Sequence, residues 1–345
     1  MKTFLLCAAL LIQAAICIAQ AGSPEPKLLA LQGDLRVHDP VMIRQGDTFY
    51  LFCTGGGPRF GGHIPIRCSK DLIEWKQCGY VFEELPAWAS QEIPGTRNPW
   101  APDVSYFNGR YHIYYSISTF GKNNSAIGLV TNTTLDSTSP DYQWEDQGMV
   151  LRSTTGVTDW NAIDPNLILE GEDKAWLAWG SFWGGIKMRR IDRTTGKLSD
   201  VDTTLYAIAS RPREGEHQTP PVVGAIEAPF IVKQGEYWYH FVSFDFCCRG
   251  KDSTYKIMVG RSEKITGPYI DKDGKRMTER GGTLLLAASE GARWVGPGHC
   301  AVVQDLPGDC LIFHAYDSES ERSTSELKIS TMVWEDGWPR VAALR

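Results

Sequence analysis

Three widely separated carboxylates in this sequence share one local setting. Asp39, Asp164 and Glu227 each stand at the start of a short apolar run that contains a proline. A carboxyl that stays ionised can activate water, and a second that stays protonated can protonate a leaving oxygen, as in glycoside hydrolysis. A third charge near them can raise the pKa of the acid and orient it. We therefore expect a hydrolytic centre if the fold brings the three side chains together.

The elements that must position these carboxylates belong to an internal repeat. A short apolar strand, a glycine-containing turn and an aromatic-rich strand recur, and Pro40, Pro102, Pro165 and Pro229 mark the first four copies at intervals of about 63 residues. A fifth copy begins at His299 and lacks the proline. Further strand-like segments follow in each period, without a convincing amphipathic helix. The pattern predicts an all-β fold, a five-bladed β-propeller, because a β-sandwich does not explain five equal periods.

Propeller geometry gives this repeat a functional meaning. The first strand of every blade lines the central axis, so the residues that head these strands converge at one mouth. An isolated Asp-Pro is typical of a strand or turn start, but three acids in register indicate a site. The predicted heads are Asp39, Asp103 or Trp100, Asp164, Glu227 and His299.

The N-terminus and the charge restrict the setting of the protein. Residues 1–21 have the three regions of a secretory signal, which predicts a secreted or periplasmic chain with one propeller domain over residues 22–345. The net charge of −6 and the absence of a basic run indicate neither a nucleic-acid nor a membrane partner. Twelve tryptophans favour sugar stacking, although many of them should fill the space between sheets. We expect a monomer that acts on a neutral polysaccharide.

The cysteines leave several pairings open. Cys68 with Cys78, or Cys300 with Cys310, could bridge neighbouring strands in an oxidising compartment, and buried free thiols are the alternative. Adjacent Cys247 and Cys248 could close only an unusual ring. No pair of C-x-x-C motifs is present, which argues against a structural zinc site.

Several motifs, in order along nearly the whole mature chain, resemble those of glycoside hydrolase family 43, and specifically of its arabinanases. They are His38-Asp39-Pro40, Trp100-Ala101-Pro102-Asp103-Val104, Ser118-Thr119-Phe120-Gly121, Ser125-Ala126-Ile127-Gly128-Leu129, Asn161-Ala162-Ile163-Asp164-Pro165-Asn166, Gly180-Ser181-Phe182-Trp183 and Gly296-Pro297-Gly298-His299. The resemblance implies an endo-1,5-α-L-arabinanase that inverts configuration and acts on arabinan or arabino-oligosaccharides. Whether attack is internal or from a chain end depends on loops that the sequence does not describe.

The resemblance also implies roles for individual residues. It makes Asp39 the general base, Glu227 the general acid and Asp164 the residue that tunes and positions the acid. Inversion agrees with the physical need for a separation of roughly 6.5–9.5 Å between base and acid, because water must fit beside the sugar. The substrate-binding residues that it implies are Trp100 as a stacking platform, Phe120, Gly121, Asn161, Ser181, Phe182 and Trp183.

A metal is expected beside His299, because similar enzymes keep a calcium ion in the axial channel next to such a histidine. Calcium prefers oxygen ligands, so its shell should be mainly water, with His299 as an odd member. A plain hydrogen-bonded imidazole is the structural alternative.

Three other functions compete with this hypothesis. A sugar-binding propeller without catalysis would use the same aromatic residues but would not need three acids. A sialidase would need repeated Ser-x-Asp boxes and an arginine cluster. Within the family, β-xylosidase or α-L-arabinofuranosidase action is the nearest alternative, and such enzymes usually carry an extra β-sandwich.

Overall fold

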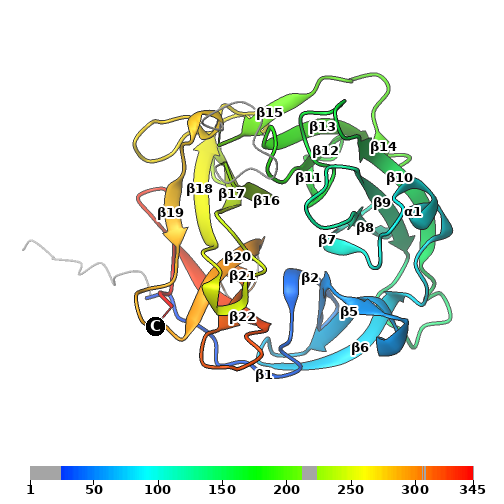
Figure 1. Cartoon of the computed structure of the whole chain (residues 1–345), viewed down its shortest axis with the longest axis horizontal. Helices are drawn as coiled ribbons and strands as arrows, with labels where there is room; N and C mark the ends of the chain where they lie inside the picture. The colour runs from blue at the N-terminus through cyan, green and yellow to red at the C-terminus, as the bar shows by residue number, and fades with distance from the viewer. Residues whose placement is uncertain (1–24, 212–223, 305, 307, 345) are drawn as a thin grey trace, which may run out of the picture.

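Five sheets follow one another along the chain and stand around a central axis (Figure 1). This computed structural model describes residues 25–211, 224–304, 306 and 308–344. Each sheet is one blade, so the predicted five-bladed β-propeller is confirmed. The predicted signal sequence, residues 1–21, lies outside the described residues. Within the described ranges, no helix has the length and apolar character needed to cross a membrane.

The strands of each blade run from the axis outward, mostly in chain order. Blade 1 contains β2 (His38–Gln45), β3 (Thr48–Thr54), β5 (Gly62–Ser69), β6 (Glu74–Phe82) and the short β1 (Gln32–Gly33) and β4 (Gly56–Gly57). Blade 2 contains β7 (Trp100–Phe107), β8 (Arg110–Ile117), β9 (Ser125–Asn132) and β10 (Glu145–Ser153). Blade 3 contains β11 (Asn166–Glu170), β12 (Lys174–Trp179), β13 (Ile186–Asp192), β14 (Lys197–Leu198) and β15 (Tyr206–Ala209).

The last two blades repeat this plan. Blade 4 contains β16 (Ile226–Gln234), β17 (Tyr237–Phe244), β18 (Lys256–Ser262) and β19 (Thr283–Leu286). Blade 5 contains β20 (Trp294–Val303), β21 (Cys310–Asp317), β22 (Ser325–Glu335) and β23 (Trp338–Val341). Helical structure among the described residues is confined to α1 (Ala87–Glu92) and the 3-10 turns η1 (Pro58–Phe60), η2 (Gly250–Asp252) and η3 (Met277–Glu279). The predicted scarcity of helices is confirmed.

The turn between β7 and β8 shows why the sequence forms hairpins at these positions. Asn108 and Gly109 have φ values of 50° and 73°, which a two-residue hairpin turn requires and which Asn-Gly tolerates best. Phe107 then pairs with Arg110 directly across the turn. In the register that follows from this turn, Asp103 pairs with Tyr114. The turn residues at one end of the hairpin therefore determine which side chains of β7 face the neighbouring blades at its other end.

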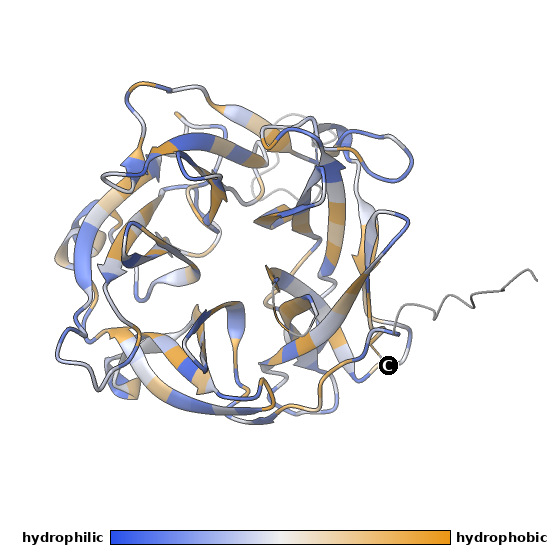
Figure 2. Ribbon diagram, turned by 180° about the vertical axis from the view of Figure 1, so that it is seen from behind, coloured by the Kyte–Doolittle hydropathy of each residue, from blue (hydrophilic) through white to orange (hydrophobic). Residues whose placement is uncertain are grey.

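The hydrophobic core is divided among the gaps between blades. One cluster joins blades 2 and 3 through side chains such as Leu129, Leu167 and Trp179, and four further clusters fill the other gaps. Apolar and polar residues accordingly alternate along the strands in Figure 2. Because each blade packs on two neighbours, the ring holds the inner strands in fixed relative positions.

The N-terminal segment closes this ring. Leu28 and Arg36 form antiparallel bridges with Ser330 and Glu326 of blade 5. Between these two bridges, β1 pairs in parallel with β6 of blade 1. The segment over residues 28–36 therefore pairs with both blade 5 and blade 1, and its hydrogen bonds hold these two blades together.

The cysteines follow one of the pairings that the sequence left open. Cys68 and Cys78 form a disulfide between β5 and β6. Cys300 and Cys310 remain free and buried, so the alternative bridge between them is wrong. The adjacent Cys247 and Cys248 are bonded to each other at the mouth of the propeller.

Candidate active site

The inner strand of every blade begins with the same backbone distortion. The pairing register of β2, β7, β16 and β20 shifts near its start, as in a β-bulge. One non-glycine residue at each of the five heads has a positive φ, a conformation that persists only where the surroundings hold it. These residues are Asp39 (51°), Ala101 (44°), Asp164 (57°), Ala228 (55°) and His299 (47°).

Hydrogen bonds from the preceding blade hold these distorted residues in place. In four blades the partner is a side chain at or near the end of the second strand. The backbone N–H groups of Ala101, Asp164, His299 and Asp39 donate to Thr54 Oγ1 (2.6 Å), Ser116 Oγ (2.9 Å), Ser243 Oγ (2.8 Å) and His314 Nδ1 (3.1 Å). The ring therefore positions the site through the same contacts that join the blades.

Blade 3 departs from this scheme at Gly180. Asn166 pairs with Ala178, so Gly180 occupies the place that Thr54 or Ser116 holds in other blades. A Cβ atom at Gly180 would lie 2.5 Å from the carbonyl oxygen of Gly185, so no side chain fits there. The Asp164 carboxylate supplies the missing acceptor for the distorted residue of blade 4, because its Oδ2 accepts the N–H of Ala228 at 3.1 Å. This bond places Asp164 beside Glu227.

Asp39 is buried among imidazoles. Its Oδ1 lies 3.1 Å from His299 Nδ1 and 3.5 Å from His38 Nε2, and its Oδ2 accepts the Thr54 hydroxyl at 2.6 Å. Burial alone would raise the pKa of Asp39, but His38, His299 and His314 together hold that pKa well below its usual range. Asp39 is therefore ionised, as a general base must be.

His299 and His314 differ in charge although both contact Asp39. Burial lowers the pKa of His299, but the Asp39 carboxylate raises it more, with smaller contributions from Asp164 and Glu227, to about 9. Burial keeps the pKa of His314 well below its ordinary value, and its Nδ1 accepts the N–H of Asp39. The positive charge beside Asp39 thus belongs to His299.

Glu227 is buried among hydroxyl groups. Its Oε2 accepts the Ser181 hydroxyl at 2.6 Å, and its Oε1 accepts the Tyr255 hydroxyl at 2.5 Å. Burial raises the pKa of Glu227, and the Asp39 charge adds to this, while the two hydroxyls and His299 oppose it without cancelling it. Burial also raises the pKa of Asp164, with contributions from Glu227 and Asp39. Asp164 and Glu227 therefore hold a proton at a pH at which Asp39 has none.

The residues predicted to bind substrate fall into two groups. Ser181 contacts Glu227 directly, and Phe182 and Trp183 follow it in a turn with φ values of 55° and 37°. Asn161, in contrast, is buried, and its Oδ1 accepts hydroxyls from Ser125 (2.7 Å) and Ser153 (3.4 Å). The structure thus gives Asn161 internal partners.

An aromatic rim continues the site over blade 2. Trp100 begins β7 and is half-buried. The ring of Phe120 is 81% exposed, in a turn that Gly121 completes with a φ of 75°. An exposed aromatic ring costs solvation unless a ligand covers it, and sugar rings stack on such surfaces. These positions suit the predicted stacking role, which stays a prediction.

Asp103 does not join the carboxylate centre. It lies beyond the distorted residue Ala101, and its carboxylate accepts Asn166 Nδ2 (3.1 Å) and the N–H of Leu167 (2.7 Å) in blade 3. Burial raises its pKa to about 7. Of the two heads predicted for blade 2, Asp103 is therefore an inter-blade contact.

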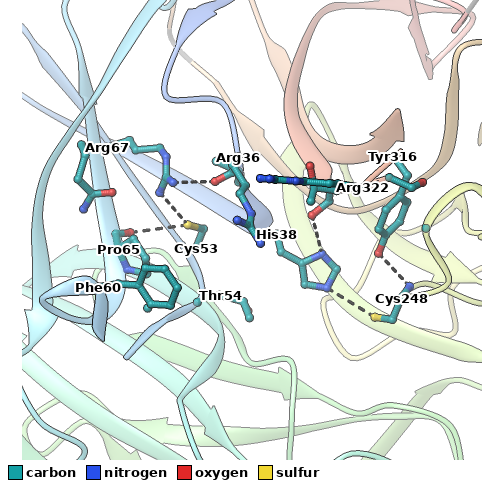
Figure 3. A pocket seen from close by; sticks show the side chains of 18 of the residues that line it. Arg36, His38, Cys53, Thr54, Phe60, Pro65, Arg67, Cys248, Tyr316 and Arg322 are labelled. Atoms are coloured by element: carbon teal, nitrogen blue, oxygen red, sulfur yellow. Dashed lines mark hydrogen bonds between the residues drawn. The ribbon is translucent and has the colours of Figure 1, made fainter. Parts of the chain in front are cut away.

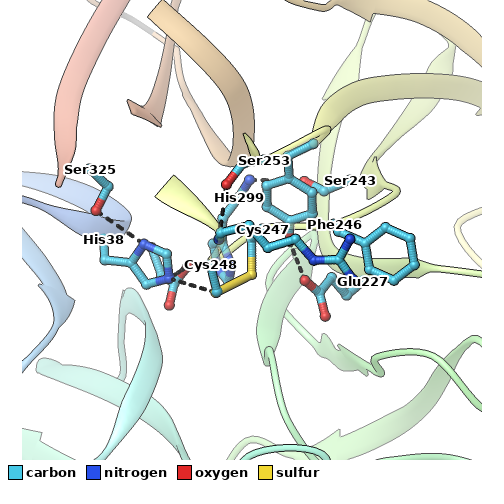
Figure 4. The surroundings of a disulfide bond; sticks show 12 residues. His38, Glu227, Ser243, Phe246, Cys247, Cys248, Ser253, His299 and Ser325 are labelled. Atoms are coloured by element: carbon cyan, nitrogen blue, oxygen red, sulfur yellow. Dashed lines mark hydrogen bonds and ion pairs between the residues drawn. A yellow bond between two sulfur atoms is a disulfide. The ribbon is translucent and has the colours of Figure 1, made fainter. Parts of the chain in front are cut away.

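Several residues at the centre were not found from the sequence. Tyr255 lies in the loop before β18, and the disulfide of Cys247 and Cys248 stands between Glu227 and His38 (Figure 4). The backbone N–H of Cys248 donates to the Tyr316 hydroxyl at 2.8 Å. For Thr54, Ser116 and Ser243 a signal did exist, because each stands at an equivalent place in its repeat.

His299 could serve as a metal ligand if metal binding displaces the proton that its raised pKa retains. Metal-binding histidines typically donate their second ring N–H to a carboxylate, and Nδ1 of His299 lies 3.1 Å from Asp39 Oδ1. Its Nε2 would then be the donor atom. His299 belongs to none of the three-residue ligand groups among the described residues, so waters would complete the shell, as expected for calcium at this position.

A propeller whose mouth holds one carboxylate of lowered pKa and two carboxyls of raised pKa has the chemistry of the glycoside-cleaving enzymes. Residues 33–339 match the family described as glycosyl hydrolases family 43. The chain belongs to this family and is a glycosidase.

Two relatives and one solved structure show how close the similarity is. The extracellular endo-α-(1→5)-L-arabinanase 1 of Bacillus subtilis is 40% identical over 98% of this chain and 97% of its own length. The extracellular exo-α-(1→5)-L-arabinofuranosidase ArbA of Cellvibrio japonicus is 42% identical over 88% of this chain and 86% of its own. The structure of a Cellvibrio cellulosa α-L-arabinanase complexed with arabinohexaose superposes with a TM-score of 0.83 at 40% identity, over 90% of this chain and 96% of that one.

Proposed function

We propose that this chain hydrolyses the α-1,5 bonds of arabinan with inversion of configuration. Asp39 activates water as the general base, Glu227 protonates the leaving oxygen, and Asp164 holds and tunes Glu227. The named relatives act on α-(1→5)-linked arabinose polymers, which supports the substrate. The observation that carries the mechanism is the different set of partners around each carboxyl.

These partners match the charge that each step requires. The imidazoles around Asp39 favour its ionised form before attack. Asp39 can then take the proton of the attacking water and release it to solvent before the next turnover. Asp164 accepts a backbone N–H, which opposes the rise of its pKa without cancelling it. Glu227 contacts two hydroxyls, and a hydroxyl can donate or accept. Glu227 can therefore lose and regain its proton while its partners stay in place.

We also propose that a calcium ion binds His299, with waters as its remaining ligands. Such an ion would supply positive charge beneath the three carboxylates. His299 itself is held by Asp39 and the backbone bond to Ser243. The relatives are named extracellular, which supports export of this chain, and we propose that it acts as a monomer.

Product analysis on linear, debranched α-1,5-arabinan tests the reaction. We expect arabinose or arabino-oligosaccharides, with the inverted anomer in NMR spectra of the fresh product, and almost no release from xylan. The Glu227→Gln variant is the matched control, because it keeps the size of the side chain and removes the acid. Preferential release of xylose, or a retained anomer, would contradict the proposal.

A further inference from the structure

A separate cavity of about 590 Å³ opens beside the base, between blades 1 and 5 (Figure 3). His38 and Thr54 line it, and both contact the Asp39 carboxylate, at 3.5 Å and 2.6 Å. None of the three proposed catalytic carboxylates lines this cavity. The cavity therefore begins one side chain away from the Asp39 carboxylate.

The charge of this cavity is opposite to that of the chain as a whole. Arg36, Arg67 and Arg322 line it, whereas no aspartate or glutamate does so among the described residues. The chain carries a net charge of −6. Three guanidinium groups without a carboxylate form a local positive potential that attracts anions. We call this cavity the arginine pocket.

Arg67 contributes a buried charge. It is 8% exposed, and its guanidinium donates to the carbonyl oxygens of Asp34 (2.8 Å) and Arg36 (2.6 Å) and to Cys53 Sγ (3.3 Å). The Cys53 thiol is neutral, because burial raises its pKa to about 11. Arg67 forms no ion pair with a described residue, so among these residues only neutral hydrogen-bond acceptors face its charge. A buried charge of this kind is costly unless something pairs with it.

Arg36 and Arg322 add two accessible charges at the same opening. Both are exposed, and neither forms an ion pair with a described residue. Two like charges on one cavity repel each other unless an anion lies between them. Guanidinium groups bind carboxylates through paired hydrogen bonds, so a carboxylate is the anion that they suit best.

The remaining wall of the arginine pocket suits a sugar. The Phe60 ring is 66% exposed, and Tyr80 also lines the cavity. Aromatic faces of this kind stack on sugar rings. The volume lies within the range of small-molecule sites and is far larger than an inorganic anion requires.

We propose that the arginine pocket binds a uronate, a sugar that bears a carboxylate, within the polysaccharide that the enzyme attacks. The uronate would lie beside the base, so one substrate molecule could occupy both sites. Substrates that combine neutral arabinan with acidic sugars would thus bind more tightly than neutral arabinan alone. The proposal depends on the proposed function only for the substrate that delivers the uronate.

Calorimetric titration of the mature protein with trigalacturonate tests the pocket without any hydrolysis. The methyl ester of the same trisaccharide is the matched ligand, because it lacks only the charge. We expect wild-type protein to bind the acid at least about tenfold more tightly than the ester at low ionic strength. The double variant Arg36→Gln/Arg322→Gln should lose most of this preference, because two of the three positive charges are then removed. Arg67 is left unchanged because it is buried.

Arg276→Gln is the control variant. Arg276 is an exposed arginine next to η3 in blade 4, outside the pocket, so its substitution should preserve the preference for the acid. Equal affinities of wild-type protein for acid and ester would overturn the proposal, as would an unchanged preference in the double variant. Displacement of trigalacturonate by equimolar inorganic phosphate would reject the sugar component. Failure of arabinan hydrolysis with an intact preference would contradict only the proposed function.

Discussion

The two sides of the propeller mouth share one backbone distortion, but their carboxyl groups differ in pKa. On the side of blades 5 and 1, Asp39 has a positive φ and is surrounded by His38, His299 and His314. On the side of blades 3 and 4, Asp164 has the same distortion, but the carboxyl pair that it forms with Glu227 contacts hydroxyls and a backbone N–H. The inner-strand bulge thus sets position, and the neighbouring side chains set protonation.

The source of this difference is the residue that each preceding blade supplies. In blade 5 the acceptor for the N–H of Asp39 is the imidazole of His314, which adds an imidazole to the surroundings of Asp39. Blade 3 supplies no side chain at Gly180, and a carboxylate fills the gap. A missing side chain in blade 3 therefore brings two carboxyls together. Burial raises the pKa of both, and the Glu227 charge adds to the rise for Asp164.

Removing either proposed catalytic carboxyl should give the largest effect and separate the two sides. We expect Asp39→Ala and Glu227→Ala each to lower kcat by about 10²–10⁴-fold or more on arabinan. An aryl arabinoside with a good leaving group needs little protonation, so it should partly restore turnover in Glu227→Ala but not in Asp39→Ala. Steady-state kinetics on both substrates measures this difference.

Thermal unfolding of both variants provides the control for that comparison. Similar melting temperatures for the variants and the wild type would attribute the losses to chemistry. Near-normal turnover of either variant on arabinan, or equal restoration of both on the aryl substrate, would contradict the assignment of base and acid.

The two limbs of the pH profile should report separately on the two sides of the mouth, with a smaller effect on turnover than removal of a carboxyl. With the proposed roles, activity requires Asp39 to be ionised and Glu227 to be protonated. Because the pKa of Asp39 is lowered, the acidic limb of kcat/KM should lie below the usual aspartate range of about 3.9. Because the pKa of Glu227 is raised, the basic limb should lie above the usual glutamate value of about 4.3.

Single hydroxyl deletions should move one limb at a time. Tyr255→Phe removes a donor that lowers the pKa of Glu227, so the basic limb should move to higher pH. Thr54→Val removes a donor to Asp39, so the acidic limb should move to higher pH. Movement of the opposite limb in either variant would show that the two sides are not separate.

Much of this architecture could be predicted from the sequence because it repeats. Pro40, Pro102, Pro165 and Pro229 marked four blades, and the copy that begins at His299 predicted the fifth. Position in the repeat then pointed to Asp39, Asp164 and Glu227. Asp103 shows the limit of this method. Repeat position alone cannot distinguish a side chain at the mouth from one that contacts the next blade, two residues further along the strand.

The remaining residues depend on contacts between loops. Tyr255 and Cys248 come from connections whose path no periodic pattern describes, yet both lie at the mouth. The arginine pocket likewise combines Arg36, near the start of the chain, with Arg322, near its end. Only the closed ring brings these segments together, so local sequence patterns carry no signal for them.

The smallest expected effect concerns the metal at His299, which would lie between the two sides. A bound calcium ion should stabilise the folded protein by about 2.7 kcal/mol when its concentration is 100 times its Kd. We therefore expect exhaustive chelation to lower the melting temperature by a few degrees and excess calcium to restore it. His299→Gln should lose this response, because it removes the one proposed protein ligand. Since positive charge near the carboxylates helps to keep Asp39 ionised, chelation should also lower activity modestly. Identical melting curves with and without chelator would leave His299 as a protonated partner of Asp39 alone, and the difference between the two sides would then arise entirely from side chains.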